Sequence, residues 1–298
     1  MLPTPDPSFS APGGALRVYY ASTDADNCAR VGYVDLDPED PTRIVARSQE
    51  PILDTGKLGT FNDSGVNASC VVAHNDEIRL YYVGYQRAGR VPILLFAGLA
   101  RSVDEGRTFQ RLSDVPILER SAAEPFTRTA PFVMRESGRY RMWYVSGEGW
   151  HRTSDGKVYS RYAIRHCESS DGVSWPASGA VCLAPAQRDD GGDGDDSEQG
   201  FARPWVIKDG ARYRMWYSIR AVLPQGGVGY DRLGYAESPD GLRWTRLDDQ
   251  VGLARSTSGW DSEMICYTAV VRAGSNAYLF YNGNGNGKTG FGCARLVD

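Results

Sequence analysis

The sequence has few of the features that mark a membrane, nucleic-acid-binding or secreted protein. No apolar run approaches the roughly 20 residues that a membrane-spanning helix needs. The first seven residues contain neither a basic nor an apolar segment of the signal-peptide type. With 33 Lys and Arg against 37 Asp and Glu, the formal net charge of −4 offers no electrostatic basis for nucleic-acid binding. We therefore expect a cytoplasmic protein whose partner is a small molecule or an oligosaccharide, with no nucleic acid and no membrane.

Metal-binding and redox motifs are lacking as well. The six cysteines include no CxxC pair. Four of them fall inside predicted strands, where a small apolar side chain packs well: Cys70, Cys167, Cys266 and Cys293. The three histidines lie in a turn, a loop and a strand and do not form a metal-binding set: His74, His151 and His166. The acidic run 189–196 lacks the ligand spacing of an EF-hand. The sequence therefore predicts no metal and no cofactor.

What the sequence does contain is a repeat. A five-residue pattern of aromatic and apolar residues, alternating as in a strand, recurs at 16–20, 78–82, 140–144, 213–217 and 277–281. The final tyrosines of the copies lie 62, 62, 73 and 64 residues apart. A period of this length holds several strands, and such repetition indicates the blades of a propeller. The longest interval contains the loop-like insertion 187–198, which leaves the register of the strands intact.

Each copy predicts a four-stranded meander. A short inner strand begins thirteen residues before each tyrosine, at Pro7, Ser69, Pro131, Pro204 and Thr268. A third strand follows the repeat, and an Asp-Gly turn then leads into an aromatic fourth strand in the segments 169–175 and 237–244. We predict an all-β fold, with residues 1–298 forming a single five-bladed β-propeller domain. Because the chain ends after the third strand of the last copy, we expect the fifth blade to be three-stranded or irregular.

In a propeller, the starts of the inner strands and the loops between second and third strands meet at one end of the channel, so a site is expected there. Acidic residues recur just ahead of the inner strands: Asp63, Glu124, Glu198, Asp261 and Glu263. Convergent carboxylates suit general acid and base catalysis on a glycosidic bond. The alternative is that some of them are turn and capping acids, which are common in loops.

Other residues near the same end are candidates for substrate binding. Arg128 and Arg203 could clamp an anion or could form salt bridges with the ring of acids. Aromatic side chains could stack on a sugar ring or pack between blades, and amides offer both donors and acceptors to hydroxyl groups. The candidates of this kind, together with neighbouring loop residues, are Trp150, His151, Trp260, Tyr267, Asn62, Asn282, Asn284 and Asp24.

The Ser-x-Asp-Gly-x-x-Trp elements at 169–175 and 238–244, with the five-fold repeat, resemble the five-bladed glycoside hydrolases. These are the arabinanase and xylosidase group, the invertase group and the β-mannoside phosphorylases. Three segments also resemble an uncharacterised bacterial branch of that superfamily, one that tends to occur with surface-polysaccharide genes: 62–66, 202–204 and 259–264. The resemblance implies a propeller fold and activity on carbohydrates.

The catalytic residues of the arabinanase group carry over only in part. Asp6, before Pro7, matches the position of that group's catalytic base. Cys70 and Val71 stand in the region of its second Asp, and Thr129-Ala130 in the region of its acid Glu. If the protein is a glycosidase, its acid and base are therefore placed differently. Asp63 and Glu263 are the preferred pair, expected to face each other over the channel.

Two hypotheses of function follow. The first is a carbohydrate-active enzyme of the glycoside hydrolase or transferase kind that needs no metal. The second is a propeller that binds or modifies a sugar-bearing biosynthetic intermediate without hydrolysing it, since one fold serves many chemistries.

Overall fold

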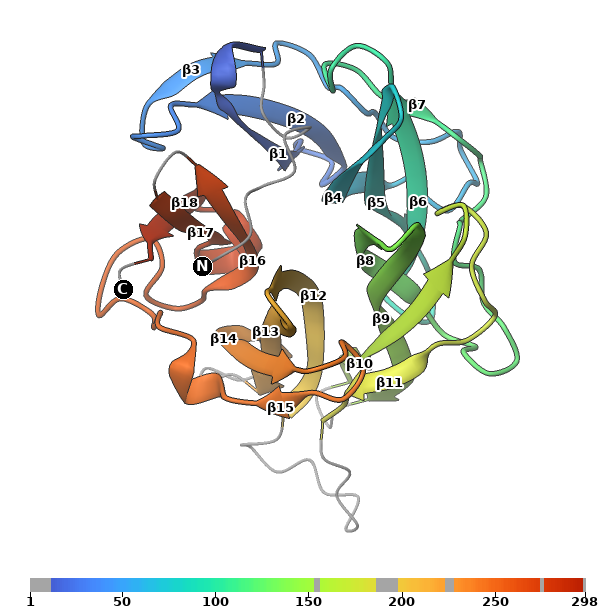
Figure 1. Ribbon diagram of the computed structural model, residues 1–298. Coiled ribbons are helices and arrows are strands. Elements are labelled where there is room, and N and C mark those ends of the chain that lie inside the picture. Colours follow the sequence, from blue (N-terminus) through green and yellow to red (C-terminus); the bar gives the residue numbers. More distant parts are fainter. Residues whose placement is uncertain (1–11, 153–155, 186–197, 223–227, 274–275, 297–298) are drawn as a thin grey trace.

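The computed structural model describes residues 12–152, 156–185, 198–222, 228–273 and 276–296. The chain is nearly all β, and its strands stand around a central channel as a β-propeller (Figure 1). The strands are β1 (Leu16–Thr23), β2 (Ala29–Leu36), β3 (Ile44–Arg47), β4 (Gly65–His74), β5 (Glu77–Arg87), β6 (Ile93–Ser102), β7 (Gln110–Arg111), β8 (Arg128–Glu136), β9 (Arg139–Arg152), β10 (Val158–Ser169), β11 (Ala180–Leu183), β12 (Glu198–Asp209), β13 (Arg212–Val222), β14 (Val228–Ser238), β15 (Thr245–Arg246), β16 (Cys266–Ala273), β17 (Asn276–Asn282) and β18 (Phe291–Arg295). The helical elements are short: η2 (Pro12–Gly14), η3 (Asp248–Gln250) and α1 (Asn284–Gly287).

Among the described residues, successive strands pair antiparallel within these groups: β1–β3, β4–β7, β8–β11, β12–β15 and β16–β18. We call them units one to five. In the described residues the last unit is a separate three-stranded sheet, as the sequence predicts. The inner strand expected at Pro7 lies outside the described residues, as does most of the insertion 187–198, and β1 is the strand of the first repeat copy. Units one to four are joined by single parallel bridges at Ala29–Gly65, Phe96–Arg128 and Tyr162–Gly200.

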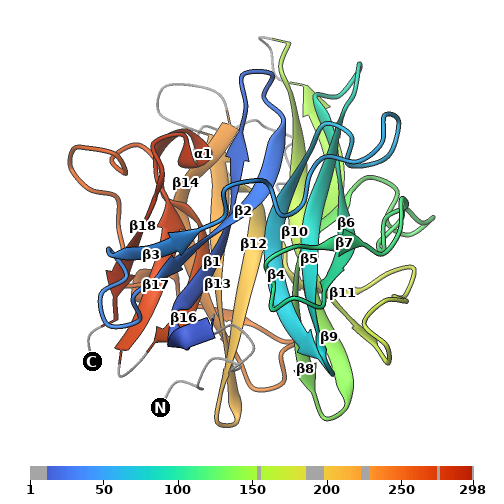
Figure 2. The same ribbon diagram turned by 90° about the horizontal axis from the view of Figure 1, so that it is seen from above.

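The strand directions define the two ends of the channel (Figure 2). Strand β1 ends where β4, β8 and β12 begin, and we call this the upper end; α1 lies there as well. The opposite ends of β4, β8 and β12 form the lower end. The strands run along the channel, so a residue's place in its strand gives its position between the upper and lower ends.

The arginine of the repeat fastens one unit to the next. Arg17, Arg79 and Arg141 each donate to the carbonyl of a residue in the tight turn of the neighbouring unit: Glu105, Asp171 and Asp240 respectively. The aromatic residue two positions later donates to the following glycine carbonyl, as Trp143 does to Gly241 at 2.8 Å. The arginine and the aromatic residue of the repeat thus have a physical role, because in these copies they reach the turn of the next unit.

The final tyrosine of the repeat has a second role within its own unit. Tyr82 lies directly across the ladder from Gly98, and Tyr217 from Gly234. A Cβ atom at Gly98 would stand 2.2 Å from the Tyr82 ring, and one at Gly234 would stand 2.3 Å from the Tyr217 ring. The glycine in the third strand therefore leaves the space that the aromatic ring fills, which lets large rings pack inside each blade.

The ring closes between the last and first units through side chains. Leu16, Val34 and Leu36 pack with Tyr278 and Phe280 in one apolar cluster. The Tyr278 hydroxyl also donates to the Glu39 carbonyl at 3.2 Å. In the part of the chain that the structure describes, no strand ladder joins these two units. In these residues the ring is therefore closed by side-chain packing and this hydrogen bond.

All six cysteines are free thiols. Over the described ranges, no helix has both the length and the hydropathy to cross a bilayer.

Candidate functional site

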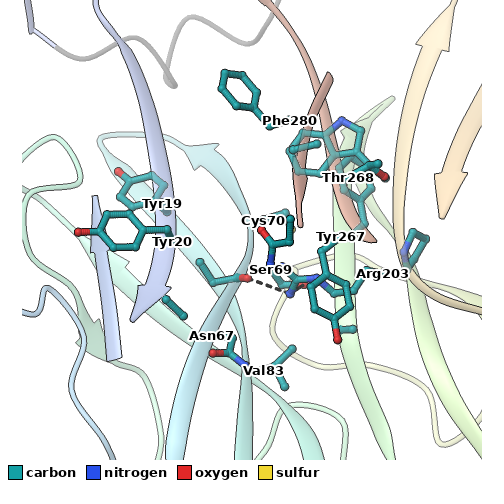
Figure 3. Close-up of a pocket in the computed structure, with 18 of the residues that line it drawn as sticks. Tyr19, Tyr20, Asn67, Ser69, Cys70, Val83, Arg203, Tyr267, Thr268 and Phe280 are labelled. Carbon is teal, nitrogen blue, oxygen red and sulfur yellow. Dashed lines mark hydrogen bonds between the residues drawn. The ribbon is translucent and has the colours of Figure 1, made fainter. Parts of the chain in front are cut away.

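The channel contains a cavity of about 1820 Å³ that is lined by residues from all five units. This exceeds the roughly 300–1,000 Å³ of a typical small-molecule pocket, because the cavity runs along the channel from one end to the other. Residues near its middle are drawn in Figure 3, where Tyr267, Arg203 and Ser69 lie close together. The volume is sufficient for an oligosaccharide.

Bulges in the inner strands shape this middle part. Ladder registers shift between Ala202 and Trp205, and again between Cys266 and Ala269. At these bulges Arg203 and Tyr267 have left-handed backbone conformations, with φ values of 54° and 59°. Such φ values are uncommon for residues other than glycine and are informative when they recur. Ala130 occupies the same place in unit three, with a φ of 47°.

Arg203 and Tyr267 contact each other in the channel. The Arg203 guanidinium lies 5.2 Å from the centre of the Tyr267 ring. It donates to the Ala68 carbonyl at 2.9 Å and lies 3.5 Å from the Ser69 hydroxyl (Figure 3). The Tyr267 backbone N–H donates to the Ser218 hydroxyl at 2.8 Å, which holds the bulge in place. Both residues were predicted from the sequence as binding residues, and the structure brings them together on the cavity wall.

Two further predicted binding residues line the cavity at its upper end. Asn282 is the last residue of β17, and its side chain donates to the Asn286 carbonyl at 3.3 Å. Asp24 follows β1 and forms an ion pair with Arg30. The hydrogen bond from Arg30, followed by that from the Cys28 backbone, lowers the pKa of Asp24. Asp24 is therefore an ionised carboxylate at the upper rim.

The cavity wall has only one other carboxylate among the described residues, Glu136. It is the last residue of β8, at the lower end. Burial raises its pKa, but hydrogen bonds from Lys208, Tyr213 and Arg141 outweigh that effect and lower the pKa to about 2. The length of β8 separates the two ends by roughly 25 Å. Asp24 and Glu136 are thus too far apart for the 5–9.5 Å spacing of a glycosidase pair.

The preferred pair from the sequence is not on the cavity wall. Asp63 is half-buried in the loop before β4, where its carboxylate accepts from the Gly59 N–H and the Ser64 hydroxyl. Glu263 is exposed in the loop before β16, and its backbone N–H donates to the Asn284 side chain at 2.8 Å. Neither residue is among those that line the channel. The structure therefore does not bring this pair together over the channel.

Glu124 and Arg128 form a buried ion pair away from the cavity wall. Their side chains are 1% and 3% exposed, and Arg128 donates to Glu124 at 3.1 Å. The Tyr144 hydroxyl and the Gly179 N–H also donate to this carboxylate, at 2.7 and 2.8 Å. With these partners the pair ties the loop before β8 to the outer part of unit three, which is a structural arrangement.

The remaining candidates of unit five form one group around the loop 259–264. Trp260 is 37% exposed and stacks on Tyr281 with ring centres 5.3 Å apart. Asp261 is buried and accepts from the Tyr281 hydroxyl at 2.9 Å. The Asn284 side chain holds the loop by accepting from the Glu263 and Met264 N–H groups. This group packs against the upper part of unit five and lies off the described cavity wall.

Five predicted residues remain. Glu198 is partly buried, pairs with Arg232 and Arg246, and is not part of the cavity wall. Asn62 is buried and donates to the Tyr82 hydroxyl at 3.0 Å inside unit two. Trp150 lies in β9 near its upper end and is not part of the cavity wall. The side chain of His151 and the whole of Asp6 lie outside the described residues. In the ranges that the structure describes, no group of three or more His, Cys, Asp and Glu residues could hold a metal ion.

Several lining residues were not foreseen as functional. Ser69 was predicted only as a strand start, and Asn67, Tyr20, Arg220 and Lys288 were not singled out. Ser69 could have been found from the repeat, because it stands one residue after the position that Arg203 and Tyr267 occupy in their units. Arg220 could have been found as a charged residue in one of the loops between second and third strands, which the sequence places at the end of the channel where the site is expected.

Comparisons with known proteins agree with this architecture. No family model matches the chain. The uncharacterized protein Rv1502 of Mycobacterium tuberculosis is 35% identical over 284 residues, which cover 95% of this chain and 89% of that protein. The uncharacterized protein MT1551, from another strain of the same species, matches over the same shares at the same identity.

Among solved structures, a thermostable family-43 glycoside hydrolase superposes with a TM-score of 0.67 at 19% identity, covering 95% of this chain and 86% of that one. A second glycoside hydrolase has a TM-score of 0.70 at 17% identity, with 100% and 90% covered. The GH32 β-fructofuranosidase of Bombyx mori has a TM-score of 0.62 at 15% identity, with 97% and 58% covered. At these identities the likeness establishes the shared propeller fold.

Proposed function

The chain belongs to the same family as the uncharacterized Mycobacterium tuberculosis protein Rv1502, and we propose that it is a carbohydrate-active protein of the glycoside hydrolase type. The observation that carries this proposal is the cavity of about 1820 Å³ inside a propeller whose fold is that of glycoside hydrolases. Its wall combines tyrosine rings with hydroxyl and amide groups, including Tyr20, Tyr267, Ser69 and Asn67. Aromatic faces and paired donors and acceptors are what a sugar ring requires.

Cleavage of a glycosidic bond is the first form of this function, and its catalytic residues are a prediction from the sequence. If Asp63 and Glu263 are the acid and base, Asp63→Asn and Glu263→Gln should each lower turnover at least about a hundredfold. Turnover is measured on aryl glycosides and oligosaccharides, after circular dichroism has verified that each variant is folded. Full turnover in both variants would remove this pair and direct attention to Asp6, Asp261 and Glu124.

Binding without cleavage is the second form, and one specific observation favours it. The two carboxylates on the described cavity wall, Asp24 and Glu136, lie at opposite ends, and each has a cationic partner. A screen that finds a bound glycan but no released product would support this form. Product release from any glycoside, lost on substitution of a carboxylate, would support the first.

A further inference from the structure

The charge of the channel differs in sign from that of the whole protein. The chain has a formal net charge of −4. The described cavity wall has five arginines and two lysines against one aspartate and one glutamate: Arg17, Arg135, Arg203, Arg220, Arg272, Lys208, Lys288, Asp24 and Glu136. A concave surface with one dominant sign concentrates ligands of the opposite sign. This distribution points to an anionic ligand.

Ion pairs neutralise only part of this positive charge. Arg17 pairs with the buried Asp35 at 2.7 Å, and Lys208 pairs with Glu136; both cations lie at the lower end. At the upper end, units four and five contribute Arg220 and Lys288 to the wall, and Arg203 lies further down, in the middle part. The carboxylate of Asp24 at that end is engaged by Arg30. Arg135 and Arg272 lie near the lower end, so positive charge is present at both ends of the described wall, and at the upper end it includes Arg220.

Arg220 is held in place by neutral groups. It lies near the end of β13, opposite Gly200 in the ladder. Its Nη1 donates to the Ser160 carbonyl at 2.9 Å, and its guanidinium stands 5.4 Å from the centre of the Tyr162 ring and 5.6 Å from that of Tyr159. Within the described residues, these are all of its partners. A carbonyl and two rings fix the direction of the side chain without cancelling its charge.

Arg220 and Tyr162 both line the cavity, so the fixed guanidinium is part of its wall. A guanidinium has five N–H groups in a planar fork that matches a carboxylate or a phosphate. Below it on the same unit, Arg203 stands among Ser69 and Tyr267, which offer a hydroxyl and a ring face. An anionic group bound at Arg220 would thus place the attached sugar ring over these groups.

We propose that the upper channel binds a sugar that carries an anionic oxygen group, a carboxylate or a phosphate, with Arg220 as the anion-binding residue. This inference rests on the proposed function, because it names the class of carbohydrate that the channel accepts. Arg203 and Lys288 add to the attraction. The shared chemistry is a guanidinium–oxyanion contact, and the probes below separate a uronic acid from a sugar phosphate.

The test compares matched sugars on the intact protein. D-Glucose, D-glucuronate and D-glucose 6-phosphate, and the corresponding mannose and galactose series, are titrated by calorimetry at low and high NaCl, with inorganic phosphate as a sugar-free probe. We expect an anionic member to bind at least tenfold more tightly than its neutral counterpart, and that advantage to shrink in high salt. Whichever anionic sugar binds more tightly, the uronate or the sugar phosphate, shows whether the anion is a carboxylate or a phosphate.

Variants then assign the effect to Arg220. Arg220→Gln should reduce the anionic advantage to less than threefold, and Arg220→Lys should keep part of it because the charge remains. Arg139→Gln is the matched control, since Arg139 is exposed, pairs with Glu168 and is not part of the cavity wall. An anionic advantage that survives intact in folded Arg220→Gln would overturn the assignment.

The outcomes of the test distinguish a failure of the anion site from a failure of the proposed carbohydrate function. Neutral sugars that bind as tightly as the anionic ones would overturn the anion site and leave the carbohydrate function standing. Inorganic phosphate that binds in an Arg220-dependent way, when no sugar binds, would support the anion site and overturn the carbohydrate function. Absence of any binding would overturn both.

Discussion

At the scale of single residues, Arg128 and Arg203 show how a small difference in register decides a role. Both precede the proline that starts an inner strand, Arg203 by one residue and Arg128 by three. Arg128 is within the regular ladder opposite Ser146 and turns into the blade, where Glu124 meets it. Arg203 stands at the bulge, and its side chain is on the channel wall. The bulge, rather than the residue type, directs the guanidinium.

The buried pair yields a prediction about Glu124. In Glu124→Gln the charge of Arg128 would stay buried without its counterion, so the free energy of unfolding should fall by about 3 kcal/mol. The measurement is urea denaturation followed by tryptophan fluorescence. Glu119→Gln, at an exposed position five residues earlier, is the control and should change stability by no more than about 0.5 kcal/mol. A loss below about 1 kcal/mol in Glu124→Gln would argue against a structural role.

At the scale of the element, the Ser-x-Asp-Gly turn is stabilised by hydrogen bonds from its own backbone to its side chains. The buried Ser238 hydroxyl accepts from the backbone N–H of Gly241 at 2.8 Å and of Asp240 at 3.2 Å. The Asp240 carboxylate accepts from the next two N–H groups, of Leu242 and Arg243. The turn carbonyls are thereby left pointing outward, where Arg141 and Trp143 of the preceding unit reach them.

Removing the serine hydroxyl should therefore loosen both the turn and the contact between units. Ser238→Ala leaves buried N–H groups without an acceptor, and we expect a loss of about 1–3 kcal/mol in the free energy of unfolding. Chemical denaturation measures this loss. Ser256→Ala, in an exposed loop, serves as the comparison and should be close to neutral. Equal stability of the two variants would show that the turn does not fasten the units.

The same turns predict a dependence of stability on pH. The Ser174 N–H donates to the Asp171 carboxylate, and the Arg243 N–H donates to the Asp240 carboxylate. These hydrogen bonds lower the pKa of both carboxyls. Burial raises the pKa of Asp104, but hydrogen bonds from Ser102 and Thr108 outweigh it and lower the pKa to about 2. A carboxyl with a lowered folded-state pKa stabilises the fold above its unfolded pKa of about 3.9, and this stabilisation is lost as the pH falls.

The melting temperature should therefore be steady above about pH 5 and should fall between about pH 4 and pH 2. A triple Asn variant at the three positions should melt lower at neutral pH and show a shallower fall on acidification. Circular dichroism melts across this range provide the measurement. Parallel curves for the two proteins would contradict the link between these turns and the acid sensitivity.

The elements also show how far the sequence predicts the fold and the site. Because strand period and turn chemistry are local, the five repeat copies and the Asp-Gly turns predict the meanders and their order. The partners of a loop carboxylate can be near in the sequence or far from it. Asp63 accepts from Gly59 within its own loop, and Asp261 accepts from Tyr281 across the unit. Whether such acids face the channel depends on these contacts, which the spacing of acids in the sequence does not contain.

At the scale of the whole molecule, the two sides of unit five are held by side-chain contacts. On the side of unit four, Trp216 and Tyr235 pack with Ile265, Val270 and Leu279. The Trp205 indole also donates to the Val270 carbonyl at 2.8 Å, so a polar contact adds to the packing. On the side of unit one, apolar side chains gather around Phe280, and the Tyr278 hydroxyl donates to the Glu39 carbonyl at 3.2 Å. Among the described residues neither junction has a strand ladder, so the ring and its channel depend on these side-chain contacts, including those of the junction with unit one.

Phe280 tests this junction. Its ring is 6% exposed, and it packs with Leu16 and Leu36 while also lining the channel cavity (Figure 3). Phe280→Ala removes the ring from this cluster and leaves a void, which typically costs about 3–5 kcal/mol in the free energy of unfolding. Urea denaturation measures this loss, with Val115→Ala at an exposed position as the control. Because the junction forms part of the channel wall, the variant should also bind any channel ligand more weakly at temperatures where it is still folded. A loss under about 1 kcal/mol with unchanged binding would mean that the ring is closed by other contacts.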